Sequence, residues 1–234
     1  MLNGTPFIYC AAFGNFVNIT YETPRRLKEI FGRIGYFLFA TREMNEVIRS
    51  NHLKITINGE EKLPNENFLL VANHISMFDA IIVVDKLKSQ PILGITKMEN
   101  EKIPVCGPFI HSAGFIALDR SNARKAISCI KKANTFIENK WCNMFVFPEG
   151  TRSKDGELLE FHAGSFNIAY RVNAPVVVCN VTGTNMISKN FPFKKTKVTI
   201  DIIDVIYASD YQDLNTQGLA DKAKEIIVNF RNSL

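Results

Sequence analysis

Residues 68–79 read Phe-Leu-Leu-Val-Ala-Asn-His-Ile-Ser-Met-Phe-Asp and set the strand-turn-helix pattern of the chain. The first five form an apolar run of strand length, typical of a strand buried on both faces of a parallel sheet. Turn residues follow, and we expect a helix over about residues 77–88. Because strands and helices keep alternating downstream, the sequence predicts an α/β domain with a mostly parallel central sheet flanked by helices. Ligands of such a sheet bind near the C-terminal ends of its strands.

Periodicity predicts the other elements of this domain. Strands are expected over residues 53–57, 92–96, 115–118, 143–147, 176–181 and 198–206. An amphipathic helix is expected over residues 122–138, with Ser121 as its cap. Its predicted inner face consists of Ala123, Ala126, Ile127, Ile130 and Ile137. A last helix, over about residues 217–231, is expected to bury Leu219, Ala223, Ile226, Ile227 and Phe230.

Composition bounds the classes of protein that this chain can represent. Its 234 residues, 46% of them hydrophobic, suffice for one large domain or two small ones with a substantial core. This excludes intrinsic disorder over most of the chain, and no period of about 20 to 50 residues recurs. The net charge of +5 suits an anionic ligand or a membrane surface. It falls short of a polyanion binder, so we expect no nucleic-acid partner.

Cysteine and histidine usage argues against a disulfide framework and against a metal site. The cysteines are odd in number, widely spaced and never arranged as C-x-x-C, which favours a reducing compartment. They are Cys10, Cys106, Cys129, Cys142 and Cys179. The four histidines, His52, His74, His111 and His162, lack the spacing of metal ligands. We therefore expect chemistry without a metal or another cofactor.

Residues 1–50 have the composition of a segment that associates with a membrane. Residues 1–21 carry no charged side chain, and the helix expected over residues 24–50 places five apolar residues on one face beside several arginines. These apolar residues are Leu27, Ile30, Phe31, Ile34 and Leu38. A helix packed on its own domain fits the same pattern. The apolar run is too short to span a bilayer and has no basic n-region before it, so we expect neither a spanning helix nor a secretory signal. The predicted division is residues 1–50 for this segment and 51–234 for the α/β domain.

His74 and Asp79 are the first candidates for chemistry. They stand five positions apart across the strand-to-helix turn, a spacing that lets the carboxylate accept a hydrogen bond from one imidazole nitrogen. The other nitrogen is then free to take up a proton, so the pair can act as a general base. A histidine beside an ordinary N-terminal aspartate of a helix is the structural alternative.

The second candidate is Phe-Pro-Glu-Gly-Thr-Arg-Ser at residues 147–153, directly after an apolar strand. Gly150 permits a close backbone approach, Thr151 adds a hydroxyl, and Arg152 offers a planar fork that can hold phosphate oxygens. The segment therefore predicts a phosphate-bearing ligand. A plain β-turn with an exposed arginine is the alternative for this segment alone.

Together, the two segments resemble the glycerolipid acyltransferases of the 1-acyl-sn-glycerol-3-phosphate acyltransferase type, often called PlsC-like. Asn-His-x-Ser-x-x-Asp at residues 73–79 and the 147–153 segment carry the resemblance. Intermediate blocks follow in order: Lys97-Met98-Glu99 with Ile103-Pro104 and Gly107, then Gly-Phe-Ile-Ala-Leu-Asp-Arg at 114–120, and Ala-Pro-Val-Val-Val at 174–178. The resemblance implies the glycerol-3-phosphate acyltransferase-like fold.

It also implies an activity in phospholipid biosynthesis. A fatty acyl group would pass from coenzyme A or acyl carrier protein to the sn-2 hydroxyl of lysophosphatidic acid, giving phosphatidic acid. His74 would be the general base and Asp79 would orient it. The acceptor phosphate would be bound by Lys97, Arg120 and Arg152. Glu149 would bind a glycerol hydroxyl or brace a basic residue, while Gly150 and Thr151 shape the substrate-binding turn.

The resemblance places the protein peripherally on the cytoplasmic face of a membrane. One departure from the family pattern is His162, where many members have lysine; it fits a surface residue in a loop that leads into a helix. Backbone N–H groups at the start of the helix after His74 are the expected donors to the thioester oxyanion. Glycerol 3-phosphate and other lysophospholipids stay open as acceptors. The competing classes are a thioester hydrolase that uses His74 and Asp79, and a non-catalytic membrane-binding module.

Overall fold

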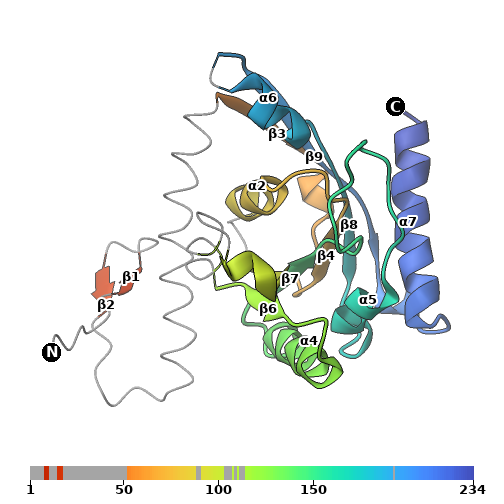
Figure 1. Ribbon diagram of the computed structural model, residues 1–234. Coiled ribbons are helices and arrows are strands. Elements are labelled where there is room, and N and C mark those ends of the chain that lie inside the picture. The colour runs from red at the N-terminus through yellow and green to blue at the C-terminus, as the bar shows by residue number, and fades with distance from the viewer. Residues whose placement is uncertain are drawn as a thin grey trace, which may run out of the picture.

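The computed structural model describes residues 52–87, 91–102, 107, 110, 114–191 and 193–234, together with the backbone of two short N-terminal strands (Figure 1). These strands, β1 (Ile8–Cys10) and β2 (Asn15–Val17), pair in antiparallel orientation. The amphipathic helix expected over residues 24–50 and the domain boundary expected at residue 50 lie outside the described residues. Both stay predictions.

A seven-stranded sheet forms the centre of the protein, with the strand order β3-β9-β8-β4-β7-β5-β6. Its strands are β3 (Leu53–Asn58), β4 (Leu69–Ala72), β5 (Ile92–Lys97), β6 (Ile116–Leu118), β7 (Asn143–Val146), β8 (Val176–Thr182) and β9 (Thr196–Ile206). Every neighbouring pair is parallel except β8 and β9. The expectation of a mostly parallel sheet is therefore confirmed.

Helices cover both faces of this sheet (Figure 1). They are α2 (Asp79–Lys86), α4 (Ala123–Glu138), α5 (Ala163–Tyr170), α6 (Ile187–Asn190) and α7 (Thr216–Asn232). Short 3-10 helices are η2 (Glu60–Lys62), η3 (Met98–Lys102), η4 (Thr184–Met186) and η5 (Ala208–Asp210). Among the described segments, none of the helices combines the length and the apolar character needed to cross a bilayer.

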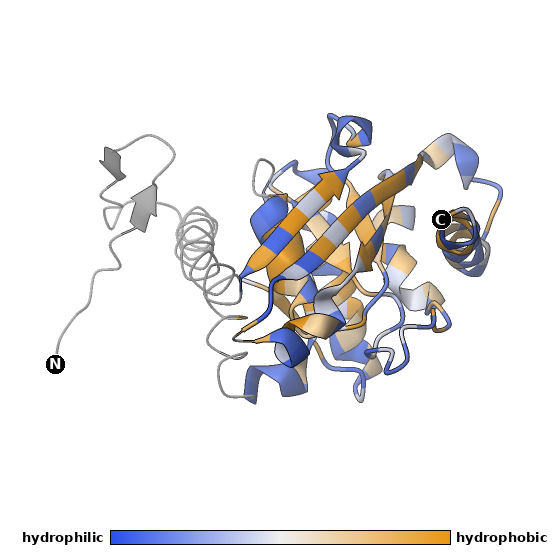
Figure 2. Ribbon diagram, turned by 90° about the horizontal axis from the view of Figure 1, so that it is seen from above, coloured by the Kyte–Doolittle hydropathy of each residue, from blue (hydrophilic) through white to orange (hydrophobic). Residues whose placement is uncertain are grey.

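Alternation along the strands divides the interior into two cores. In β4, Leu69 and Val71 join the core beneath α4, α5 and α7, whereas Leu70 and Ala72 join the core beneath α2 and α6. All four side chains are fully buried, which explains why the strand reads as an unbroken apolar run. Figure 2 shows hydrophobic residues concentrated along the strands and hydrophilic residues in the surrounding loops.

Two expectations for α4 are wrong. Asn122, not Ser121, caps the helix, because its side chain accepts a hydrogen bond from Lys125 N at 3.1 Å. The Ser121 hydroxyl instead donates to Asp119 at 2.6 Å. The buried face is also rotated from the expected one: it contains Cys129, Ala133, Phe136 and Ile137. Ile127 is 52% exposed, because it lies outside the face of α4 that packs on the core.

The sheet topology gathers many loops at one edge. Strands β4 to β8 are mutually parallel, so their C-terminal ends all lie at this edge. Strand β9 runs antiparallel to β8 and therefore begins there, as does β3, which is parallel to β9. We call this side the C-terminal edge. It is where the predicted site residues stand.

Candidate active site

His74 and Asp79 are in contact, as their spacing predicts. Asn73 holds the end of β4 in place: its side chain donates to Val181 O at 2.9 Å and accepts from Val181 N at 2.7 Å. His74 follows directly, and Asp79 is the first residue of α2. The Nδ1 atom of His74 lies 2.8 Å from Oδ2 of Asp79. The turn between β4 and α2 therefore places both side chains together on the C-terminal edge.

The Asp79 carboxylate is fully buried and satisfied by four donors. Oδ2 accepts from His74 Nδ1 and from the backbone N–H groups of Ile75 and Ser76, each at 2.8 Å. Oδ1 accepts from the hydroxyl of Thr184, which is itself buried. An ionised carboxylate is an acceptor only, so Nδ1 of His74 carries the proton in this arrangement. Nε2 is left as a proton acceptor, on a side chain that is 20% exposed.

The segment 147–153 fixes the position of His74 from the neighbouring strand. Phe147 stacks on the imidazole with a centroid distance of 4.2 Å and an interplanar angle of 7°. The backbone N–H of His74 donates to Glu149 Oε1 at 2.7 Å, and its carbonyl accepts from Ser153 N at 2.8 Å. The two segments singled out from the sequence therefore pack together: Phe147, which follows β7, restrains the imidazole of His74, which follows β4.

Glu149 braces the backbone in this unit. Its side chain is only 2% exposed, and its second carboxylate oxygen accepts from Leu159 N at 3.1 Å. Burial raises the pKa of the Glu149 carboxyl, while the hydrogen bonds from His74 and Leu159 act in the opposite direction. The hydrogen bonds of Glu149 are to backbone amides, and the positive charge of Arg231 also acts to lower the pKa of its carboxyl. A contact between Glu149 and a substrate hydroxyl stays a prediction.

Arg120 packs directly on the turn at Gly150. The backbone of Gly150 has a φ of +65°, and a Cβ atom there would lie 2.4 Å from Nη2 of Arg120. Glycine alone satisfies both the left-handed conformation and this close approach. Arg120 comes from the loop after β6, so the turn joins the end of a third strand to the site.

Lys97 and Arg152 complete a group of cations on this edge. Lys97 ends β5 and lies opposite Leu118 of β6, while Arg152 is exposed two residues after Gly150. Strands in a sheet are about 4.8 Å apart, so the end of β5 lies roughly 10 Å from that of β4. Within the described part of the chain, no hydrogen bond or ion pair engages the side chains of Lys97, Arg120 or Arg152. They can therefore bind an anion.

Thr184 is a further residue of the site, and the sequence motifs do not indicate it. It stands 105 residues after Asp79, and the left-handed Gly183 that follows β8 turns it toward the carboxylate. Only the pairing of β4 with β8 brings the two together. The sequence alone carries no signal for this contact, because threonine after glycine is common in turns.

The backbone amides expected to stabilise an oxyanion are largely engaged. Those of Ile75 and Ser76 donate to Asp79, and that of Phe78 donates to the Ser76 hydroxyl at 3.2 Å. The amides of these three residues therefore support the base. Donation to an oxyanion by another backbone amide at the start of α2 stays a prediction.

Three cysteines have described side chains: Cys129, Cys142 and Cys179 are buried and form no disulfide. Burial raises the pKa of Cys129 to about 11 and also raises the pKa of Cys179, which makes these two thiols poor nucleophiles. No three histidine, cysteine or acidic side chains among the described residues lie close enough together to hold a metal ion.

His162 is exposed at the N-cap of α5, and its backbone N–H donates to Pro148 O at 2.9 Å.

Comparison with known proteins identifies the family of this chain. The acyltransferase family model matches residues 54–182. The 1-acyl-sn-glycerol-3-phosphate acyltransferase of Limnanthes douglasii is 33% identical over 150 residues, which cover 64% of this chain and 53% of the relative. The enzyme of the same name from Escherichia coli (strain K12) is 26% identical over 210 residues, covering 85% of this chain and 84% of the relative.

Among solved structures, the fold resembles the 1-acyl-sn-glycerophosphate (LPA) acyltransferase PlsC from Thermotoga maritima, with a TM-score of 0.60 and 23% identity. The match covers 88% of this chain and 84% of that one. The chain spans about half the length of the first plant relatives it matches. The family model covers more than half of the residues and includes both segments of the site. The chain therefore belongs to the acyltransferase family.

Proposed function

We propose that the protein is a 1-acylglycerol-3-phosphate acyltransferase, which transfers a fatty acyl group from a thioester to the sn-2 hydroxyl of lysophosphatidic acid. One observation carries the proposal: His74 is held with a free Nε2 on the same edge as the unengaged cations Lys97, Arg120 and Arg152. A base beside an anion site suits an acceptor with both a hydroxyl and a phosphate. The names of the similar proteins support the same acceptor.

His74 acts on the hydroxyl proton. As the hydroxyl oxygen attacks the thioester carbonyl, Nε2 accepts its proton, a role typically worth roughly 10² to 10⁴ in rate. The imidazolium that forms is stabilised by Asp79, which bonds Nδ1 at 2.8 Å. The carbon–sulfur bond then breaks, and the proton passes from Nε2 to the departing thiolate. The products are phosphatidic acid and a free thiol.

The cations bind the phosphate of the acceptor. Arg152 offers a planar fork on an exposed position, and Arg120 lies against the backbone of Gly150, one strand from the base. Lys97 adds a point charge at the end of β5. In this arrangement the turn at Gly150 fixes the distance between the phosphate and the hydroxyl that His74 activates.

Donor and location extend the proposal. The donor is acyl-CoA or acyl carrier protein, and the reaction needs no cofactor beyond that substrate. Because the acceptor and the product are lipids, the protein acts at the cytoplasmic face of a phospholipid membrane as a peripheral protein. The N-terminal segment, residues 1–50, supplies apolar and basic residues for this attachment.

An acyl-transfer assay over a panel of acceptors tests the proposal. Purified protein is incubated with acyl-CoA or acyl carrier protein, and with lysophosphatidic acid, glycerol 3-phosphate, another lysophospholipid or no acceptor. Free thiol and phosphatidic acid should appear together, and only with lysophosphatidic acid. Thiol release that does not depend on the acceptor would identify a hydrolase instead, and transfer to glycerol 3-phosphate alone would change the acceptor.

Substitution of the base tests the mechanism in the same assay. His74→Ala should abolish transfer in a folded protein, and Asp79→Asn should be less damaging. His162→Ala is the matched control, because His162 is exposed at a helix N-cap and should be dispensable. Near-normal turnover by folded His74→Ala protein would refute the mechanism.

A further inference from the structure

Two exposed aromatic residues stand between α6 and β9. Phe191 is 51% exposed and Phe193 is 94% exposed, the highest value among the large hydrophobic side chains described. Met186, just before α6, is 40% exposed. Large apolar side chains that gather on one surface mark a site of interaction with another apolar body. We use the name exposed loop for residues 186–191 and 193–197, which include α6 and the first two residues of β9.

The exposed loop is also strongly basic. It carries Lys189, Lys194, Lys195 and Lys197, all exposed, and it contains no acidic residue. Aromatic side chains flanked by lysines are typical of segments that lie in the interface of an anionic bilayer. There the rings enter the boundary of the acyl chains and the ammonium groups meet the lipid head groups.

The fold holds this loop in place with its phenylalanines outside. Ile187 is buried in the core beneath α6, and Phe191 N donates to its carbonyl at 3.0 Å. At the other end Thr196 is buried, and its hydroxyl accepts from Asn190 Nδ2 at 3.0 Å. Because both ends of the loop are anchored in the fold, the fold itself keeps Phe191 and Phe193 on the surface.

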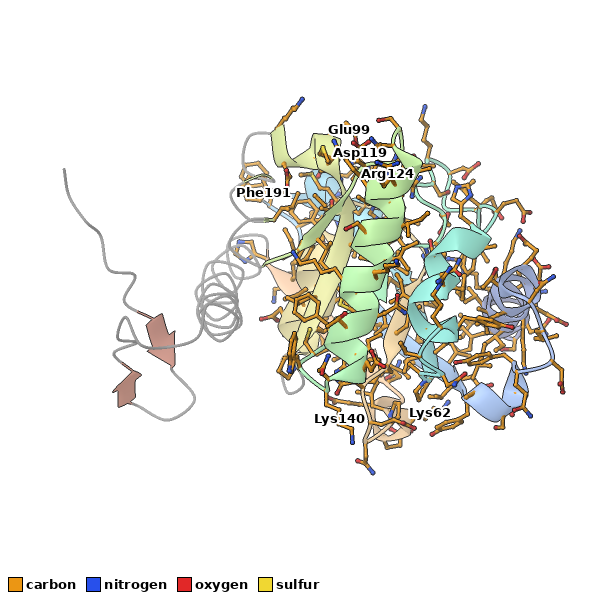
Figure 3. All side chains as sticks on the ribbon, turned by 90° about the horizontal axis from the view of Figure 1, so that it is seen from below. Lys62, Glu99, Asp119, Arg124, Lys140 and Phe191 are labelled. Carbon is orange, nitrogen blue, oxygen red and sulfur yellow. The ribbon has the colours of Figure 1, made fainter. Side chains whose placement is uncertain are left out.

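The exposed loop lies on the C-terminal edge, beside the site. It leads into β9, which begins where β8 ends, since Thr182 pairs with Thr199. Figure 3 shows Phe191 at the same end of the molecule as Asp119 and Arg124, with Lys140 at the opposite end. Met77, three residues after His74, is 44% exposed on this edge as well.

The start of the α/β domain lies at the same corner. Thr196 N donates to His52 O at 3.3 Å, and Leu53 pairs with Thr196 in the sheet. The chain that arrives from residues 1–50 therefore enters the domain beside the exposed loop. A lipid surface that binds one of these two segments is within reach of the other.

We infer that the exposed loop docks on an anionic phospholipid bilayer, inserting Phe191 and Phe193 and placing its lysines among the head groups. Docking turns the C-terminal edge, and with it His74, toward the lipid surface. The orientation rests on the proposed function, because the acceptor is resident in the bilayer. The contact itself can be measured without any acyl transfer.

A fluorescence measurement on the full chain tests the contact. Trp141 is the one tryptophan of the sequence, and it lies beside Lys140 at the end opposite to the exposed loop. It serves as an internal control. In the variant Trp141→Phe/Phe193→Trp the reporter moves to the loop. Both proteins are bound to vesicles of phosphatidylglycerol and phosphatidylcholine with brominated acyl chains, which quench tryptophan that enters the bilayer.

Quenching should occur for the tryptophan at position 193 and not for Trp141. A protein that floats with the vesicles while position 193 is unquenched, or that quenches equally at both positions, overturns the inference. Failure of the full chain to bind anionic vesicles does so too. These readouts are independent of turnover, so they separate the inference from a failure of the proposed function.

Paired variants measure the strength of the contact. Phe191→Ser/Phe193→Ser should lower partitioning onto anionic vesicles by about tenfold or more, since two apolar rings are lost. Tyr207→Ser is the matched control: Tyr207 is 44% exposed but follows the end of β9, at the opposite edge. Equal binding of the two variants contradicts the inference. A change in oligomeric state without vesicles would identify a contact between copies of the chain instead.

Discussion

Replacement of Thr184 by valine should impair the base without removing any group that touches the substrate. The Thr184 hydroxyl donates to Oδ1 of Asp79, whereas the other three donors of this carboxylate all bind Oδ2. Valine keeps the shape of threonine and removes the hydroxyl. One oxygen of a fully buried carboxylate then loses its only described donor.

The size of the effect follows from that loss. An unsatisfied buried acceptor costs about 1–3 kcal/mol. If the carboxylate rotates to recover a partner, it misaligns His74, and each 1.4 kcal/mol of lost transition-state stabilisation lowers the rate about tenfold. Thr184→Val should therefore reduce kcat by roughly 10- to 100-fold. The KM for the acceptor should not change, because Thr184 is buried behind Asp79 and does not reach the phosphate site.

Serine at the same position separates positioning from packing. Thr184→Ser keeps the donor but removes a buried methyl group, at a cost of about 1 kcal/mol of unfolding free energy. It should be less stable to urea and yet nearly fully active. Thr182→Val, at an exposed position two residues earlier, controls for the change of residue type. If Thr184→Val turns over within twofold of the Thr182→Val control, Thr184 has no positioning role.

Three further predictions concern the turn after β7. Arg152→Ala should raise the acceptor KM about tenfold, while Lys154→Ala, nearby and also exposed, should not; a raised KM for the donor alone would move the arginine to the donor side. Gly150→Ala and Gly156→Ala should each lose about 1–3 kcal/mol in urea unfolding, because both glycines have positive φ. Only Gly150→Ala should also raise the acceptor KM, since its methyl group would collide with the guanidinium that covers the turn, whereas nothing lies within 4 Å at position 156. Burial of Glu149 should make the free energy of unfolding fall as pH rises, because the pKa of its carboxyl is raised in the folded state. Its contribution to the free energy of unfolding is full below the ordinary pKa of about 4.3 and is lost as the pH passes through the raised value. Urea unfolding from about pH 4 upward should show this decline in the wild type and not in Glu149→Gln; the same dependence of the free energy of unfolding on pH in both proteins would refute the prediction.

The main elements of the fold are predictable from local patterns. The unbroken apolar run of β4 predicts a strand buried on both faces, and the structure places its side chains alternately in two cores. The expected strand over residues 198–206 is β9 (Thr196–Ile206), although its antiparallel direction is not encoded locally. Direction depends on which edge the preceding loop returns to, and that is a property of the whole sheet.

Amphipathic patterns are ambiguous when two apolar stripes compete on one helix. In α4 the positions of Ala126, Ile127 and Ile130 form one stripe, and those of Cys129, Ala133 and Phe136 form another. The structure buries the second and leaves Ile127 exposed. Periodicity identifies the helix but does not decide which stripe meets the sheet, because that choice depends on the volume available beneath it.

The site divides in the same way between local and tertiary information. The contact between His74 and Asp79 is predictable, because five residues across a tight turn leave few geometries. The packing of Arg120 on Gly150 is not, since it joins loops from different strands. Glu149 belongs to a recognisable segment, yet its contacts to two backbone amides appear only in the folded chain.

A single short segment connects the base to the surface proposed to meet the lipid. Thr184 supports Asp79 from inside, and Phe191 stands exposed seven residues later. Ile187, 1% exposed, is buried between them and anchors α6 in the core. Because Ile187 anchors α6 independently of Thr184 and of the phenylalanines, loss of the phenylalanines should weaken membrane binding while the hydrogen bond to Asp79 persists.

The Phe191→Ser/Phe193→Ser protein should therefore keep its rate of transfer to a short-chain, water-soluble acceptor and be about tenfold slower toward an acceptor embedded in vesicles. Thr184→Val should be slower toward both acceptors. Equal loss toward the two acceptors in the phenylalanine variant would show that the segment acts on the base and not on the membrane.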